Sequence, residues 1–256
     1  MSRYARQIAV PGFGLQAQKR YQTARVLVVG AGGLAAPVLQ YLAGAGLGHI
    51  RLVDDDVVDV TNLHRQTIFR ADDVGRPKAQ AAAEAMRALN PEVTIEPVCH
   101  KLDPITVADL CQDVNLVLEC ADRSAASYIL SDHCRAYRLP LISASVTQTS
   151  GYAGGFCGDA PSLRAIFPDL PQTMGSCAED GVLGPVVGIL GSLQAQMALA
   201  VLAGLSPSPL GQLVTVDAGG MRFGGFRFRP LAPRQDMRPV ALGQLFRVAA
   251  FAHPAL

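Results

Sequence analysis

Short apolar runs alternate with longer apolar or amphipathic segments along the first half of the chain. Residues 25–29 (RVLVV) form one such run, a glycine-rich turn and an apolar segment to about Gly46 follow, and a second run lies in HIRLVDDD. Short continuous apolar runs are typical of buried strands, and the longer segments between them are typical of helices. The order strand, helix, strand predicts two parallel strands joined by a right-handed crossover.

The same alternation continues to about residue 150. We predict helices over about 76–89 and 104–112 and a third that ends near Arg138, with strands at 92–98, in VNLVLECAD and in LPLISAS. A helical arm with Ser2 as its N-cap is expected before the first strand. Strands and helices that alternate over this length predict an α/β fold with a Rossmann-like, doubly wound and mainly parallel sheet.

The pattern changes after Ser150. Residues 151–182 are rich in glycine, proline and polar residues without clear periodicity, which predicts a long irregular crossover loop. No charged residue occurs from Gly181 to Val216. That stretch is long enough to span a membrane, but its proline, glycines and glutamines favour a buried helix over roughly 185–204. Two short strands near 212–217 and 222–228 complete a C-terminal lobe.

We therefore predict one domain over residues 1–256. Its expected parts are a helical arm (1–24), a nucleotide-binding core (25–150), the crossover loop (151–184), and a C-terminal helix with short strands (185–256). Half of the residues are hydrophobic, which is enough for one large core. The net charge of +1 and the absence of tryptophan argue against a nucleic-acid or membrane-surface protein.

The ends and the cysteines indicate the compartment. The opening MSRYARQIAV has no apolar leader segment, which predicts a cytoplasmic protein. None of the six cysteines forms a C-x-x-C pair, which argues against a zinc knuckle or a dithiol redox motif. Cys177 lies in a polar, glycine-rich loop before the apolar helix, where its thiol is either activated or inert. We interpret the other five cysteines as core residues.

The turn after the first strand carries Gly30, Gly32 and Gly33. Glycines there let a backbone approach a phosphate closely at a helix N-terminus, although a packing turn without a ligand has the same sequence. NAD, FAD and ATP sites all use this turn. Asp54 ends the next strand, 24 residues after Gly30, which suits a carboxylate that binds ribose hydroxyls. Asp56 lies beside it and is either part of the site or solvated, whereas Asp55 is expected to be solvated.

Cations follow these acids. Arg65 and Lys78 suit phosphate oxygens, the first as a bidentate fork and the second as a point charge, although either can be an ordinary surface cation. Asp122 follows the strand VNLVLECAD at the edge where ligands bind in open α/β sheets, so it can hold Mg²⁺ on substrate phosphates or cap the next helix. His64 and His133 have no partner pattern and are expected to be structural.

Taken together, these motifs resemble the ThiF/MoeB/HesA branch of the ubiquitin-activating enzyme superfamily. The matching segments are RYARQI with a following GFG, VLVVGAGGL, LVDDDVVDVTNLHRQ, VGRPKAQ, ECAD and SCAEDGVLGPVVGILGSLQA. They occur in family order over about residues 3–200. The resemblance implies that ATP·Mg²⁺ and the C-terminal Gly-Gly carboxylate of a ubiquitin-like sulfur carrier react to an acyl-adenylate and pyrophosphate, ahead of thiocarboxylate formation with sulfur from a separate donor.

The resemblance also implies residue roles. Gly33 would lie against the phosphates, Asp54 would bind the ribose, and Asp122 would hold Mg²⁺. Arg6 would reach the triphosphate across a homodimer interface, and Cys177 would take part in sulfur transfer. The remaining nucleotide-binding positions, some of them shared with catalysis, are Gly30, Gly32, Asp56, Asn62, Arg65, Gln66 and Lys78.

Three features depart from the family pattern. The two C-x-x-C pairs that bind structural zinc in typical members are missing, the first being replaced by residues 162–165, so no zinc site is expected. Ala35 replaces the third glycine of the turn. Arg123 replaces the asparagine that usually follows the Mg²⁺ aspartate, which leaves nucleotide geometry and substrate choice open.

Three other functions stay open at this point. Adenylation of a peptide or small-molecule carboxylate is compatible with the missing zinc ligands and with Arg123. An NAD-dependent oxidoreductase would share the glycine turn and Asp54, but it would leave Arg65, Lys78 and Asp122 without a role. A non-catalytic protein that only binds a carrier would not need the charged ATP-site residues.

Overall fold

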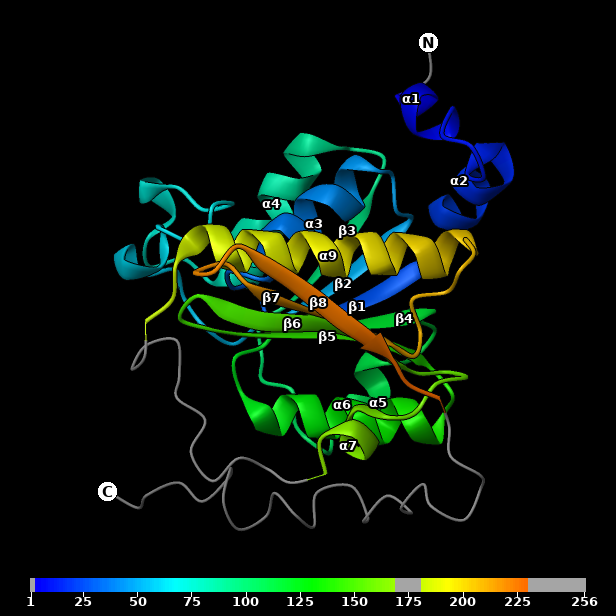
Figure 1. The fold of residues 1–256 in the computed structure, drawn as a ribbon. Coiled ribbons are helices and arrows are strands. Elements are labelled where there is room, and N and C mark those ends of the chain that lie inside the picture. Colours follow the sequence, from blue (N-terminus) through cyan, green and yellow to red (C-terminus); the bar gives the residue numbers. More distant parts are fainter. Residues whose placement is uncertain (1–2, 169–180, 230–256) are drawn as a thin grey trace.

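The computed structural model describes residues 3–168 and 181–229. Its centre is an eight-stranded sheet with the order β3-β2-β1-β4-β5-β6-β7-β8 (Figure 1). The strands are β1 (Arg25–Val29), β2 (His49–Val53), β3 (Thr94–Val98), β4 (Leu116–Glu119), β5 (Pro140–Thr147), β6 (Ser150–Cys157), β7 (Gln212–Asp217) and β8 (Arg222–Arg227). The pairs from β3 to β5 are parallel and the pairs from β5 to β8 are antiparallel. The predicted α/β class with a mainly parallel core is thus confirmed.

The register of the parallel strands aligns their carboxyl ends. Val29, the last residue of β1, is opposite Val53 of β2 and Glu119 of β4. The loops that follow these three strands therefore leave the sheet at one edge. Because the chain moves to β2 on one side of β1 and to β4 on the other, the end of β1 is a topological switch point.

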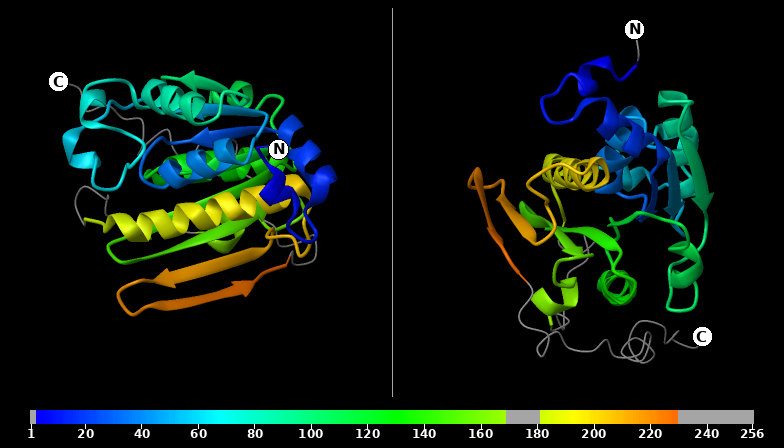
Figure 2. Two further views of the ribbon diagram at one scale, coloured as in Figure 1. Left: turned by 90° about the horizontal axis from the view of Figure 1, so that it is seen from above. Right: turned by 90° about the vertical axis from the view of Figure 1, so that its right-hand side faces the viewer.

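Helices cover both faces of this sheet, as Figures 1 and 2 show. One face carries α2 (Gly14–Thr23), α3 (Ala35–Gly44), α4 (Lys78–Leu89) and α9 (Gly184–Ala203), and the other carries α5 (Val107–Leu110), α6 (Ser124–Ala136) and α7 (Leu163–Ile166). Two apolar cores result, because successive strand side chains point to opposite faces. Val26 and Val28 of β1 belong to the first core, and Leu27 and Val29 belong to the second. A short helix, α1 (Ala5–Ile8), precedes α2.

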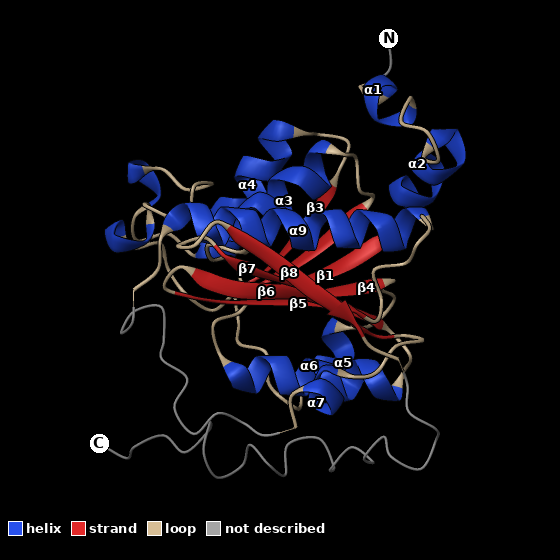
Figure 3. Ribbon diagram, viewed as in Figure 1, coloured by secondary structure: helices blue, strands red, loops and turns tan. Residues whose placement is uncertain are grey.

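The irregular loop predicted from residue 151 is wrong in its first part. Residues 150–157 form the full strand β6, which pairs with β5 through a tight turn and with β7 on its other side (Figure 3). Three glycines in β6 hid the alternating pattern. Gly155 is needed there, because a Cβ would lie 2.6 Å from the carbonyl oxygen of Pro209. The later part of the predicted loop, 169–180, lies outside the described residues, as does the predicted cap Ser2.

The predicted apolar helix over 185–204 is confirmed as α9. Pro185 stands in its first turn, and Gly204 ends it in the left-handed conformation that favours glycine. By length and composition α9 could also cross a membrane, but half of its most apolar window is buried inside the fold, as in a core helix. Gly191 lets α9 approach the start of α3, since a Cβ there would lie 2.4 Å from the carbonyl oxygen of Leu34.

Candidate functional site

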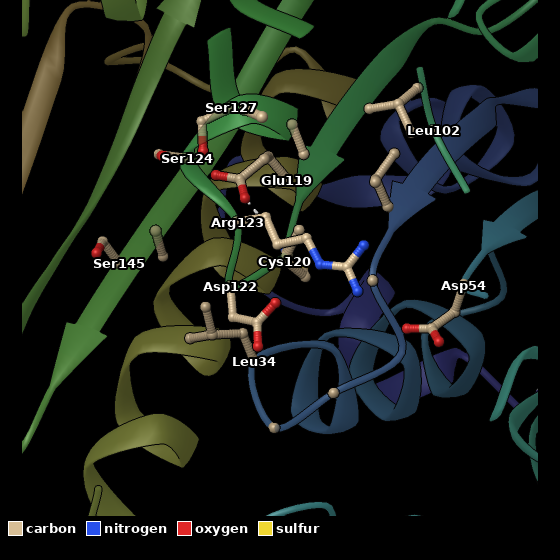
Figure 4. A pocket seen from close by; sticks show the side chains of 18 of the residues that line it. Leu34, Asp54, Leu102, Glu119, Cys120, Asp122, Arg123, Ser124, Ser127 and Ser145 are labelled. Carbon is tan, nitrogen blue, oxygen red and sulfur yellow. Dashed lines mark hydrogen bonds between the residues drawn. The ribbon is translucent and has the colours of Figure 1, made fainter. Parts of the chain in front are cut away.

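A cavity of about 860 Å³ lies at the carboxyl ends of β1, β2 and β4 (Figure 4). This is the switch point at which open α/β sheets bind their ligands. Nine residues predicted as nucleotide-binding line it together: Gly30, Gly32, Gly33, Asp54, Asp56, Arg65, Gln66, Lys78 and Asp122. The fold therefore brings residues from five separate segments of the chain to one site.

The three glycines of the turn have different reasons to be glycine. Gly30 has φ +96°, and a Cβ there would lie 2.7 Å from the carbonyl oxygen of Cys120 at the end of β4. At Gly33 a Cβ would lie 2.7 Å from a methyl carbon of Val187 in α9. Only Gly32 has open space, with the Gln66 amide nitrogen 3.7 Å away. Packing thus accounts for Gly30 and Gly33, while Gly32 leaves room for a ligand against the backbone.

Asp54 connects the glycine turn after β1 and the loop after β2 by hydrogen bonds to its carboxylate. One carboxylate oxygen accepts a hydrogen bond from the Ala31 amide at 2.7 Å, and the other accepts one from the Asp56 amide at 2.8 Å. Burial raises the pKa of Asp54, and these two amides counteract that effect. The side chain thereby links the glycine turn to the next loop while it still lines the cavity, where it can accept hydrogen bonds from a ligand hydroxyl.

Lys78 is not the ordinary surface cation that the sequence left open. It is the first residue of α4, its side chain is only 8% exposed, and its Nζ lies 3.0 Å from Oδ2 of Asp56. The backbone amide of Lys78 also donates to the Asp56 carbonyl at 2.9 Å. A buried ammonium with a single exposed carboxylate partner can exchange that partner for a phosphate oxygen at little cost.

Arg65 points a second positive charge at the cavity. Its guanidinium contacts the Thr61 carbonyl at 3.3 Å and the ring Nε2 of His64 at 2.8 Å. Within the described part of the chain no carboxylate lies at ion-pair distance from Arg65. Its charge is therefore available to an anionic ligand.

Gln66 and Asn62 contribute differently. Gln66 is 4% exposed, and its Oε1 is a buried polar atom without a hydrogen-bond partner among residues 3–168 and 181–229. Such an atom is costly unless a ligand or solvent satisfies it, so Gln66 is well suited to bind a ligand. Asn62 is not among the cavity-lining residues. Its carbonyl accepts the amides of Arg65 and Gln66 at 3.1 and 2.9 Å, so it holds the turn that presents both side chains.

Asp122 lies exposed in the turn between β4 and α6. The alternative role as the N-cap of the next helix is wrong, because the N-cap residue of α6 is Arg123, whose side chain makes no capping hydrogen bond. In Figure 4 the carboxylate of Asp122 lies on the same side of the cavity as Leu34, next to the glycine turn. Asp122 is negatively charged, so it can lie next to an anion bound at that turn only if a cation sits between the two.

Glu119 is a site residue that the sequence reasoning missed. This last residue of β4 is 1% exposed, and its carboxylate accepts hydrogen bonds from Ser143 Oγ at 2.6 Å, from the Ala121 amide at 3.1 Å and from Ser127. Burial raises its pKa to about 7 against these donors. The bond to Ala121 fixes the turn that carries Asp122. The sequence signal that could have identified Glu119 is an acidic residue at the end of the apolar run VNLVLE, where a buried strand ends.

Several predicted residues stand apart from the cavity. Arg6 is exposed in α1 and is not among the lining residues, and Cys177 lies outside the described residues. Cys99 is exposed, so its interpretation as a core residue is wrong, because it follows β3 rather than belonging to it. The four other described cysteines are buried as expected. His133 is buried and stacks on Tyr137 at a centroid distance of 4.5 Å, in a structural role.

The described residues contain no group of three or more Cys, His, Asp or Glu side chains that could hold a metal ion. The cavity offers a glycine turn, the cations Arg65, Lys78, Lys101 and Arg123, the carboxylate of Asp54 at the end of β2, and the exposed carboxylate of Asp122. This set matches a nucleotide triphosphate with a bridging cation better than a dinucleotide.

Comparison with known proteins agrees with this geometry. A family model described as the ThiF family matches residues 4–239. The chain belongs to the ThiF family. It is 40% identical over 225 residues to the SAMP-activating enzyme E1 of Haloferax volcanii, an alignment that covers 87% of this chain and 83% of that protein. The family expected from the sequence motifs is confirmed.

Longer relatives match as well. The chain is 42% identical over 234 residues to the adenylyltransferase and sulfurtransferase MOCS3 of Bos taurus, and 42% over 211 residues to UBA4 of Yarrowia lipolytica. These alignments cover 90% and 79% of this chain but 51% and 52% of the relatives. The ThiF-family chain therefore spans about half the length of these two proteins.

Solved structures share the fold. The structure of E. coli MccB with ATP superposes with a TM-score of 0.77 at 20% identity, covering 93% of this chain and 74% of MccB. MccB with AMPCPP and MccA superposes with a TM-score of 0.80 at 19% identity and the same coverage. At this identity the likeness establishes the fold alone.

Proposed function

We propose that this ThiF-family protein is an ATP-dependent adenylyltransferase that activates the C-terminal Gly-Gly carboxylate of a small ubiquitin-like sulfur-carrier protein. The observation that carries the proposal is that one cavity is lined by a glycine turn, by the cations Arg65 and Lys78, and by the exposed carboxylate of Asp122. The names of its relatives support the same reaction, since they are an E1 activating enzyme and adenylyltransferases. An NAD-dependent oxidoreductase would leave Arg65, Lys78 and Asp122 without a function.

The cavity fits ATP on the evidence of its own residues. Gly32 leaves open space at the backbone for a phosphate. Within the described residues, Oε1 of Gln66 has no hydrogen-bond donor and Arg65 has no carboxylate partner. Asp54 would bind ribose hydroxyls beside the turn. Asp122 would hold Mg²⁺, whose chemistry there is to neutralise phosphate charge.

The reaction needs positioning more than acid–base chemistry. A carboxylate oxygen of the carrier forms a bond to the α-phosphorus, the bond from that phosphorus to its bridging oxygen breaks, and pyrophosphate leaves with the electron pair. The attacking group is already an anion, so no side chain has to remove a proton. Arg65 and Lys78 lower the barrier by matching the negative charge on the phosphate oxygens, and the fixed turns hold the reacting atoms in line.

Further parts of the proposal lie beyond a single copy of the chain. Arg6 would reach the triphosphate of a partner copy in a homodimer, which agrees with its place in the arm outside the cavity of its own chain. Cys177 would serve sulfur transfer, and a separate donor would supply the sulfur. A cytoplasmic location completes the proposal.

The decisive experiment is carrier-dependent exchange between pyrophosphate and ATP, measured with candidate carriers that end in Gly-Gly and with small acids. Lys78→Ala and Asp122→Ala should each lose about 10²–10³ in exchange rate, because each removes a preorganised charge contact. Cys177→Ser should keep exchange within a few fold, because a thiol adds nothing to attack on phosphorus. The exposed Lys19 of α2 offers a matched control, since Lys19→Ala removes a lysine outside the cavity.

Two results would contradict the proposal. Exchange that requires a small acid and ignores every carrier would favour adenylation of another carboxylate. Loss of exchange in folded Cys177→Ser protein would place the thiol in the adenylation step. A thermal-shift assay provides the nucleotide control, because ATP with Mg²⁺ should raise the melting temperature and NAD should not.

A further inference from the structure

Arg123 and Asp55 form an ion pair at the cavity. The guanidinium Nη1 lies 3.7 Å from Oδ2 of Asp55, with side-chain exposures of 49% and 39%. Both residues line the cavity. Asp55 is an exposed loop acid, as expected, and the fold adds that Arg123 lies beside it.

The sheet order determines where this pair lies. Asp55 follows β2 and Arg123 follows β4, and these two strands flank β1 as its parallel neighbours. A contact between the loops after β2 and β4 must therefore pass over the end of β1, where the glycine turn begins. Figure 4 shows the Arg123 guanidinium extending into the cavity, between Asp122 on one side and Asp54 on the other.

We propose that Arg123 is a nucleotide-contacting residue that leaves Asp55 and binds the α-phosphate when ATP enters. This inference rests on the proposed function. Asp54 marks the ribose end of the nucleotide and Asp122 marks the cation on the outer phosphates. The group between the ribose and the outer phosphates is the α-phosphate, and the guanidinium lies between the two markers.

The exchange of partners is energetically favourable. A half-exposed ion pair at this distance stabilises the protein very little. A guanidinium that forms charge-assisted, bidentate hydrogen bonds to a phosphate gains considerably more. Arg123 is therefore held at the cavity by a partner that it can exchange at little cost. When ATP binds, the positive charge of Arg123 joins those of Arg65 and Lys78 around the reacting phosphorus.

A binding experiment without the carrier tests this. Isothermal titration calorimetry measures adenosine, AMP and ATP with the wild-type protein and Arg123→Asn. We expect the variant to bind AMP and ATP about tenfold to a hundredfold more weakly, since it loses hydrogen bonds to a charged group, and to bind adenosine within about twofold of wild type. Arg138→Asn is the matched control, because Arg138 is an exposed arginine paired with Asp159 and does not line the cavity.

A second pair of variants separates direct contact from mere shielding of Asp55. In the Asp55→Asn background, Arg123→Asn should weaken AMP and ATP binding by the same factor as in the wild-type background, because the contact that is lost is with the phosphate. The inference is overturned if the weakening disappears in the Asp55→Asn background, if adenosine is weakened as much as AMP, or if AMP is unaffected. Should wild-type protein bind neither AMP nor ATP, the proposed function falls and takes this inference with it.

Discussion

Replacement of Glu119 by glutamine should remove a pH dependence of stability that is built into the cavity floor. The wild-type carboxyl is completely buried, and its pKa is raised from 4.5 to about 7. Between those values the folded protein binds a proton that the unfolded chain releases. The stability that this proton provides is complete below about pH 4.5 and is lost as the pH rises through about 7.

The size of the effect follows from the same two values. A pKa difference of this size corresponds to about 3 kcal/mol between the two protonation states. The free energy of unfolding of wild type, minus that of Glu119→Gln, should therefore fall by about 3 kcal/mol from pH 4.5 to above pH 7. Glutamine has nearly the same shape, and the hydroxyls of Ser143 and Ser127 can turn to accept from its amide.

Urea denaturation of both proteins over this pH range measures the difference. The pKa of His49, of His133 and of Asp54 is also shifted by burial, but these groups are common to both proteins and cancel. Ser143→Ala provides a second check, because losing one donor to the carboxylate should raise the pKa of Glu119 further. A difference between wild type and Glu119→Gln that stays flat, or that grows with pH, would refute the reasoning.

The glycine turn and the metal content give two further predictions. Gly30→Ala should lower the free energy of unfolding by several kcal/mol, because residue 30 has φ +96° and its Cβ would lie 2.7 Å from a carbonyl oxygen. Gly32→Ala should lower it by less than about 1 kcal/mol, because a Cβ there has open space. Equal losses in chemical denaturation would contradict this assignment. Purified untagged protein should contain no stoichiometric zinc, and one zinc per chain in elemental analysis would mean that ligands were overlooked.

The sequence alone determined the order of strands and helices in the parallel half and named most of the charged residues and turn glycines that line the candidate site. Apolar runs and turn glycines are local features, and the residues of a switch-point site follow directly from where parallel strands end. Gly30, Asp54, Lys78 and Asp122 could be named for this reason without coordinates. The antiparallel strand β6 escaped because its three glycines carry no alternating pattern.

Tertiary structure decided what depends on segments that are distant in sequence. The contact of Arg123 with Asp55 spans two strands on either side of β1, and the burial of Glu119 requires Ser143 from β5 and the Ala121 amide at the turn after β4. Lys78 became a buried cation because α4 begins against the loop that carries Asp56. Charge and burial at these positions arise from packing between elements, and no local pattern of residues records which distant side chain will lie within 4 Å of another.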